Sequence, residues 1–163
     1  MGVWGGRMLG WLLGLAFSIV VMVGGSVAMG LFAGSRPAGL GVSDGKLAEP
    51  NQRPNNVHSQ IATDDLHYVA PIAPQGDVLK AFKKLKALVG EMPKCRVVTE
   101  RDDYLYVEFS SPIMGFVDDT EFYLEPKRGL IHARAAARLG IRDFGANRGR
   151  IEDIRARLAA AGH

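Results

Sequence analysis

The chain has 163 residues, of which 20 are basic and 17 acidic, for a formal charge of +3. This length leaves room for one compact domain, and the near balance of charge beyond residue 34 argues against a nucleic-acid binder, which would carry a clustered basic excess. Cys95 is the single cysteine, which excludes an intramolecular disulfide and a cysteine-based metal site.

An uncharged segment from Met8 to Ala33 follows a short N-terminal tail of residues 1–7. As a helix it is long enough to cross a hydrocarbon layer of ~30 Å, and a domain of this size could not cover a helix that is apolar on every face. We therefore predict a single transmembrane helix that acts as a signal anchor, with the lipid bilayer as its partner. A cleaved signal peptide is the alternative, because Arg7 and Ser26-Val27-Ala28 fit its pattern.

Charges flank this segment on both sides, with Arg7 before it and Arg36, Lys46 and Arg53 after it, and this count by itself favours the opposite orientation or none. A short stub before an apolar run is typical of an uncleaved export signal, so we expect the soluble domain outside the cytoplasm, in the periplasm. Small residues at Gly10, Gly14 and Ser18 recur every four positions and would let a second helix approach closely. A homodimer or a membrane-protein partner is therefore a hypothesis.

Residues 34–50 are rich in turn-forming residues and lack an apolar period, so they are predicted to form a flexible linker to a soluble domain over residues 51–163. This domain opens with an extended segment, Arg53–Gln60, and a short strand is expected within Leu66–Ile72. An amphipathic helix follows from Asp77 to Gly90.

Alternating apolar residues then predict two β-hairpins. Pairing of Glu125 with Leu130 across the second turn sets the register of that hairpin. This register places Glu121 opposite Arg134 on the outer face and Asp118 on the apolar side. The predicted strands run from Cys95 to Glu100, Tyr104 to Ser110, Phe116 to Glu125 and Leu130 to Arg138.

A last helix is predicted from Asn147 to Ala161, with Asn147 as its N-cap. The fold class is therefore α+β: a two-layer domain with a roughly four-stranded antiparallel sheet and two packed helices on its alanine-rich face, preceded by one transmembrane helix.

Three segments of the predicted domain form an ordered set of motifs: Arg53–Gln60, Phe116–Phe122 and Arg138–Arg148. Together they resemble the domain of unknown function 1499 family, over essentially Arg53 to Leu158. The resemblance implies a bacterial or plastid protein that is often exported or membrane-attached, and it brings no established activity or catalytic residue. Family members commonly show a cysteine and a Ser-Ser pair in the first motif, where this chain has Asn56 and His58-Ser59.

The strongest candidate site is the loop that leads into the last helix. Its glycines free the backbone to turn, and the helix N-terminal amides and several arginines can face the same space, which suits a small anionic ligand. In the alternative, Asp143 or Asp118 already pairs with these arginines in an internal network that pins the helix to the sheet. The candidate ligand-binding residues are Arg138, Arg142, Asp143, Asn147 and Arg148.

Other polar residues are weaker candidates. His58, His67 and the two aspartates show no metal-ligand spacing, and Ser59 follows His58 directly, so that their side chains point apart. No catalytic residue, metal ligand or cofactor is therefore assigned. The residues considered for a supporting role are Asn55, His58, Asp118 and Asp119.

These patterns favour a non-enzymatic accessory or binding module of the cell envelope, and nucleic acid is not an expected partner. One rival function is a metal-dependent or simple hydrolase that would use Asp118, Asp119 and His58. Another is a structural membrane partner that assembles through Gly10 and Gly14.

Overall fold

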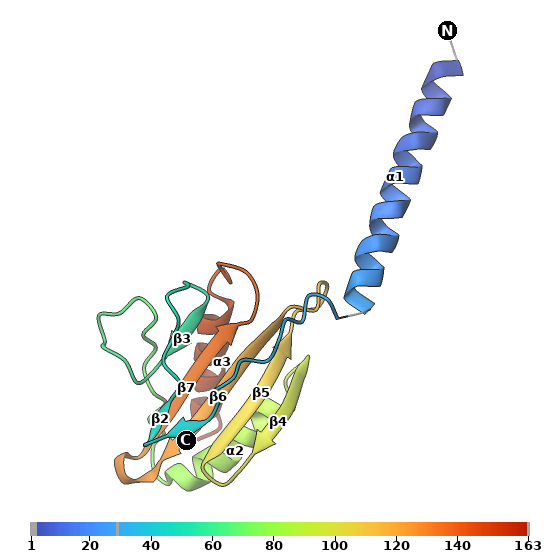
Figure 1. Cartoon of the computed structure of the whole chain (residues 1–163). Helices are drawn as coiled ribbons and strands as arrows, with labels where there is room; N and C mark the ends of the chain where they lie inside the picture. Colours follow the sequence, from blue (N-terminus) through green and yellow to red (C-terminus); the bar gives the residue numbers. More distant parts are fainter. Residues whose placement is uncertain (1–2, 29, 163) are drawn as a thin grey trace.

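A long helix, α1 (Val3–Ala28), precedes a domain in which two helices cover one face of a five-stranded antiparallel sheet (Figure 1). This computed structural model describes residues 3–28 and 30–162. The strand order is β3-β7-β6-β5-β4. The strands are β3 (Asn56–His58), β4 (Cys95–Glu100), β5 (Tyr104–Ser110), β6 (Val117–Glu125) and β7 (Leu130–Ala137).

The α+β class is confirmed, with one more strand in the sheet than predicted. That strand is β3, which pairs with β7 through Val57 and Ala135, because the predicted extended segment Arg53–Gln60, which contains β3, lies along the sheet edge. The segment Leu66–Ile72 forms no strand in the structure and contributes only single bridges to the neighbouring chain, at Tyr68 and Ile72.

The hairpin of β6 and β7 has the predicted register, with Glu125 opposite Leu130 and Glu121 opposite Arg134. A short 3-10 turn, η1 (Pro126–Arg128), joins the two strands, and Gly129 closes it with a φ of 65°, a left-handed conformation that glycine adopts without strain. Side chains therefore alternate between the helix-covered face and an outer face as the sequence pattern predicts.

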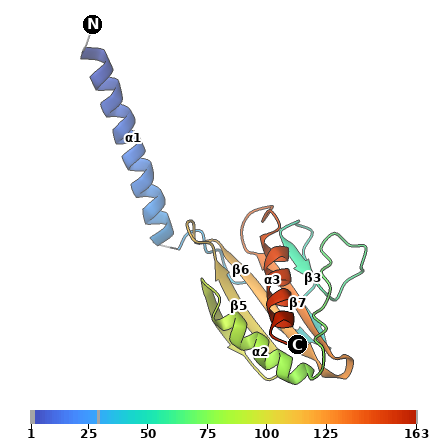
Figure 2. The same ribbon diagram turned by 180° about the vertical axis from the view of Figure 1, so that it is seen from behind.

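The helices α2 (Val78–Gly90) and α3 (Ala146–Ala160) lie side by side on the inner face (Figure 2). Asp77 caps α2 by accepting hydrogen bonds from the backbone of Leu79 and Lys80, as predicted. The prediction of Asn147 as the N-cap of α3 is wrong, because the cap is Gly145 and Asn147 lies inside the first turn.

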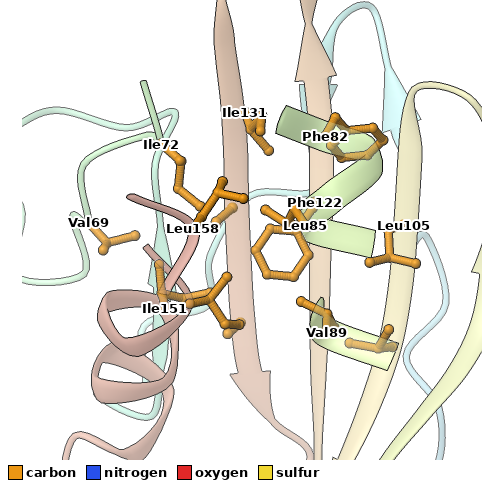
Figure 3. Close-up of a cluster of buried hydrophobic side chains, with 14 of the residues drawn as sticks. Val69, Ile72, Phe82, Leu85, Val89, Leu105, Phe122, Ile131, Ile151 and Leu158 are labelled. Atoms are coloured by element: carbon orange, nitrogen blue, oxygen red, sulfur yellow. The ribbon is translucent and has the colours of Figure 1, made fainter. Parts of the chain in front are cut away.

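The main core lies between the helices and the sheet (Figure 3). Phe82 and Leu85 of α2 and Ile151 of α3 are fully buried against Phe122 of β6. Small residues on β7, such as Ala133, let the helices approach the sheet closely, which gives the packing density that protein interiors require.

Residues 34–50, which we call the connector, lie along the outer face of the sheet. They include a small hairpin of β1 (Val42–Ser43) and β2 (Lys46–Leu47), and Leu47 is buried against Tyr104 and Tyr106. The structure therefore differs from the expectation of a flexible linker, because contacts with the sheet order a segment that has no apolar period of its own.

The helix α1 is long and apolar enough to cross a membrane, although a signal sequence would pass the same test. It begins at Val3, inside the predicted tail of residues 1–7, of which residues 1–2 lie outside the described part of the chain. It ends at Ala28, earlier than the predicted Ala33, and the chain turns at Gly30 with a φ of 67°. The exposed apolar span within it runs from Met8 to Ser26.

Candidate functional site

The outer face of the sheet carries a network of charged side chains centred on Glu108, in the middle of β5. Its carboxylate is almost fully buried, yet it accepts hydrogen bonds from three arginines that come from different parts of the chain. Arg36 of the connector and Arg96 of β4 each approach to 2.6 Å, and Arg138 donates from the end of β7.

Asp119 of β6 lies directly opposite Glu108 in the strand register. Two carboxylates in this position repel each other, and the side chain of Arg138 compensates for this by contacting both. Its Nε lies 2.9 Å and its Nη2 2.7 Å from the carboxylate oxygens of Asp119. The hydroxyl of Tyr106 donates a further hydrogen bond to Asp119 at 2.6 Å.

The network shifts the protonation of its members. Burial alone would raise the pKa of Glu108, but hydrogen bonds from Arg36, Arg138 and Arg96 outweigh burial and lower it to about 2. Burial and the hydrogen bond to Asp119 raise the pKa of the Tyr106 hydroxyl, so this group stays protonated and acts as a donor. Hydrogen bonds to Glu108 and Asp119 in turn raise the pKa values of Arg36 and Arg138, so these guanidinium groups and the Glu108 carboxylate remain charged near neutral pH.

A second buried pair lies beside the first. Glu121 of β6 is fully buried and accepts hydrogen bonds from Arg134 at 2.8 Å and from the Tyr104 hydroxyl at 2.7 Å. The backbone N–H of Gly41, in the connector, donates to the same carboxylate at 2.7 Å. Both clusters thus use buried charges of the sheet to hold the connector in place.

The residues predicted to bind an anion do not converge in this structure. Arg138 belongs to the network on the outer face. Arg148 donates instead to the backbone carbonyls of Leu66 and Tyr68 at 2.9 and 2.6 Å, and Arg142 is exposed. The guanidinium groups of this loop therefore point in different directions.

Asp143 and Asn147 have roles within the loop and helix. The carboxylate of Asp143 accepts from the backbone N–H of Gly145, the N-cap of α3, and from that of Asn147 in the first turn. The side-chain amide of Asn147 is buried and donates to the carbonyl oxygen of Asn55 at 3.1 Å. Asp143 thus binds backbone amides of its own loop, whereas the alternative expected Asp143 or Asp118 to pair with the arginines.

Arg150 and Asp118 form a pair of this kind. Their side chains meet at 2.9 Å on the inner face and join α3 to β6. Burial raises the pKa of Asp118, and the positive charge of Arg150 opposes this shift. Asp118 and Asp119 are consecutive strand residues on opposite faces, so they cannot act together on one substrate.

The remaining supporting candidates are buried at the sheet edge. The side-chain amide of Asn55 donates to the carbonyl oxygen of Gly140 at 2.9 Å, which ties the first motif to the loop before α3. The Nδ1 atom of His58 accepts from the backbone N–H of Gln60, and burial followed by the charge of Arg134 lowers its pKa. Within residues 3–28 and 30–162, no three histidine, cysteine or acidic side chains assemble as metal ligands.

Two features of the site could not be predicted from the sequence. The connector contacts depend on pairings such as Arg36 with Glu108, which no local pattern reports. Ser59 contacts His132 of the adjacent strand instead of its neighbour His58. Ser59 lies in the first motif and His132 in the predicted second hairpin. Only the pairing of β3 with β7 brings these two side chains together.

Two loops lie at the end of the domain nearest α1 (Figure 1), and apolar side chains on them are exposed. Phe144 is 96% exposed, Ile113 81% and Ile141 72%. The chain leaving α1 passes close to both loops, since the ring of Phe32 lies 5.5 Å from that of Phe116 and a Cβ added at Gly34 would lie 3.1 Å from Leu139. The ordered connector thus fixes these loops close to the C-terminal end of α1.

The fold and this site define a two-layer α+β domain joined by an ordered connector to an apolar helix long enough to span a bilayer. The family model described as protein of unknown function (DUF1499) matches residues 46–158, which covers most of the chain. The protein therefore belongs to the DUF1499 family, as the three motifs predicted. A comparison with curated proteins finds no match.

Proposed function

We propose that this protein is a membrane-anchored accessory module of the cell envelope that holds its domain against the bilayer surface. The proximity of Phe32 and Gly34 to the two exposed loops carries the proposal. Because these residues closely follow α1, a helix inserted in the membrane would bring the loops to the lipid headgroups. We call residues 111–116 and 138–145 the membrane-facing loops.

The chemistry of these loops supports contact with lipid. An exposed phenylalanine and two isoleucines are costly in water and favourable at the boundary between headgroups and acyl chains. Arg142 is exposed on the same loop as Phe144 and suits an anionic headgroup. The loop that was predicted to bind a small anion would thus bind a lipid surface instead of a small ligand in a pocket.

The connector would make this arrangement rigid. A flexible tether of the same length would let the domain turn freely above the membrane, whereas Arg36 and Gly41 fasten the connector to buried carboxylates of the sheet. The domain would then present its face opposite the membrane-facing loops, including the β4–β5 turn, to partners in the envelope.

Alkaline carbonate extraction of membranes from cells that express the full-length chain tests the anchoring. We expect the intact protein in the pellet, at the mass of the uncut chain. Release of a shortened chain into the soluble fraction would contradict the proposal and support a cleaved signal peptide.

The side of the membrane is tested separately with two C-terminal reporter fusions, one active only in the cytoplasm and one active only in the periplasm. We expect activity from the periplasmic reporter alone. Activity from the cytoplasmic reporter alone would reverse the proposed orientation and leave the anchoring intact.

A further inference from the structure

We propose that Ser59, His132 and Glu125 form a nucleophilic site that hydrolyses a small ester carrying negative charge. Ser59 directly follows β3, His132 lies in β7 and Glu125 ends β6, and the pairing of these strands brings the three residues together. This inference goes beyond the anchoring role and does not depend on it. It keeps Ser59, which the sequence paired with His58, and replaces that histidine with His132 as the base.

The three side chains are connected by hydrogen bonds. The Oγ atom of Ser59 lies 3.2 Å from Nδ1 of His132, and Nε2 of His132 lies 2.8 Å from a carboxylate oxygen of Glu125. A nucleophile within reach of a base, with the base oriented by a third group, is the arrangement that activates serine in hydrolases. Here the two ring nitrogens have exchanged the positions they occupy in the common serine protease triad.

The hydrogen-bond partners fix where the protons lie. The backbone N–H of Ala133 donates to Ser59 Oγ at 2.9 Å, so the hydroxyl accepts there and is free to donate its own proton to His132. An ionised Glu125 only accepts, which places the ring proton on Nε2 of His132 and a lone pair on Nδ1. The ring therefore presents its basic nitrogen to the serine.

The imidazole is held in this orientation by its surroundings. The ring of Tyr123 stacks on that of His132, with centroids 6.1 Å apart and planes inclined by 19°. Ser59 and His132 are both buried, and Glu125 is partly exposed at the end of its strand. A rigid base beside a buried hydroxyl is the preorganised geometry that a nucleophilic site requires.

Ser59 and His132 also line a cavity of 360 Å³, within the range of sites for small ligands. Lys46 of the connector hairpin and Arg128 of η1 line the same cavity, together with Tyr68. Two cations beside a nucleophile favour a substrate that carries a carboxylate or phosphate, and they can stabilise negative charge on the carbonyl oxygen as it develops. The backbone N–H of Ser59 already donates to the carbonyl of Ala133, so this stabilisation would come from the cationic side chains.

The reaction balances with water as the only co-reactant. Ser59 Oγ attacks the ester carbonyl carbon and its proton passes to His132 Nδ1, after which the C–O bond to the alcohol breaks and the leaving oxygen takes that proton. Water then attacks the acyl-serine and gives a proton to His132, and Ser59 regains it as the acid leaves. Glu125 stays ionised throughout and stabilises the imidazolium.

The test uses the full-length protein in detergent, with a fluorophosphonate probe and p-nitrophenyl esters of acetate and succinate. We expect a covalent adduct on the peptide that contains Ser59, and hydrolysis of both esters. Ser59→Ala should remove the adduct and the activity, and His132→Gln should lower the labelling rate at least a hundredfold. Ser111→Ala is the matched control, because Ser111 also accepts a backbone N–H, from Phe116.

Two further variants separate catalysis from structure. Glu125→Gln, at a positioning residue, should lower kcat for both esters and leave KM nearly unchanged, because the imidazolium loses its carboxylate partner. Lys46→Gln should raise KM for the succinate ester several-fold and leave the acetate ester nearly unchanged. Folding of each variant is checked by its thermal transition.

The proposal is overturned by folded wild-type protein that forms no adduct at Ser59. It is equally overturned by an adduct that forms at the same rate in His132→Gln, since this would show that the Ser59 hydroxyl reacts without help from the imidazole. Should Ser59→Ala not fold, these two measurements still decide the matter, because neither requires that variant.

Discussion

Arg36 of the connector donates two hydrogen bonds to one carboxylate oxygen of Glu108, in the middle of the sheet's outer face. Its guanidinium group also lies 5.7 Å from the centre of the Tyr106 ring. Arg36 itself is partly exposed, whereas Glu108 is buried, so a residue at the surface forms an ion pair with a buried carboxylate. This contact links the chain that leaves α1 to the centre of the domain.

Glu108→Gln should loosen the connector, because a neutral amide cannot balance Arg36, Arg96 and Arg138. Removing one partner of a buried ion pair costs about 3 kcal/mol or more, and we expect a loss of this size in the free energy of unfolding. Limited proteolysis should cut residues 34–50 faster in this variant than in the wild type.

Glu100→Gln is the control for this change, since Glu100 makes a single salt bridge with Lys86 on the surface and should matter by less than about 1 kcal/mol. Equal cleavage of the connector in the wild type and in Glu108→Gln would show that the network does not hold it.

Lowering the pH should also weaken the attachment of the connector to the sheet. The pKa of Glu108 is about 2 in the folded protein, below the ordinary value of 4.5, so its ionised form is the one that folding stabilises. The stabilisation is therefore complete above about pH 4.5 and is lost as the pH falls toward 2. Hydrogen exchange at the Gly41 amide, followed across this range, should show falling protection.

The same experiment on Glu108→Gln provides the comparison. The glutamine does not titrate, so protection of Gly41 should be lower at neutral pH and should change less between pH 4.5 and 2. A wild-type profile that stays flat over this interval would exclude Glu108 as the acid-sensitive group.

Two arginines of the predicted anion site should behave differently. Arg138→Ala leaves Glu108 and Asp119 opposite each other without the side chain that joins them, and we expect destabilisation of about 3 to 5 kcal/mol in chemical unfolding. Arg142→Ala changes an exposed residue and should alter stability by no more than about 0.5 kcal/mol. Similar stabilities for the two variants would argue against an internal role for Arg138.

Much of the fold could be predicted because its signals are local. The apolar stripe of α2, its cap at Asp77 and the alternation along β6 and β7 each depend on neighbours within a few residues. The register of the hairpin followed from one turn, and this correctly placed Glu121 opposite Arg134. The family match follows from the same segments.

The connector and the capping of α3 could not be predicted in this way. The connector is ordered by Leu47, Arg36 and Gly41, which contact residues far away in the chain. Asn147 resembles an N-cap by residue type, but Gly145 takes that position, and Asn147 lies in the first turn, where its backbone N–H donates to Asp143 and its side-chain amide to Asn55. A pattern of residue types cannot decide between two such competitors, because the choice depends on tertiary contacts.

Phe144 should enter the lipid boundary when the full-length chain is placed in vesicles. A fluorophore that responds to polarity, attached at Phe144→Cys in a Cys95→Ala background, should shift to the blue and be quenched by brominated acyl chains. The control position is Leu79, which is 60% exposed but lies beside Asp102 of the β4–β5 turn, at the opposite end of the sheet from residues 111–116. A label there should report water.

The positive charge of Arg142 allows a second comparison, between vesicles with and without anionic lipid. The blue shift and quenching at position 144 should be larger in vesicles with anionic lipid than in neutral vesicles. Arg142→Gln should reduce this difference, because one basic residue near an anionic surface contributes about 1 kcal/mol to binding. Equal signals at positions 79 and 144 in both kinds of vesicle would mean that the domain turns freely above the membrane. The rigid connector would then set the domain's distance from the bilayer without setting its orientation.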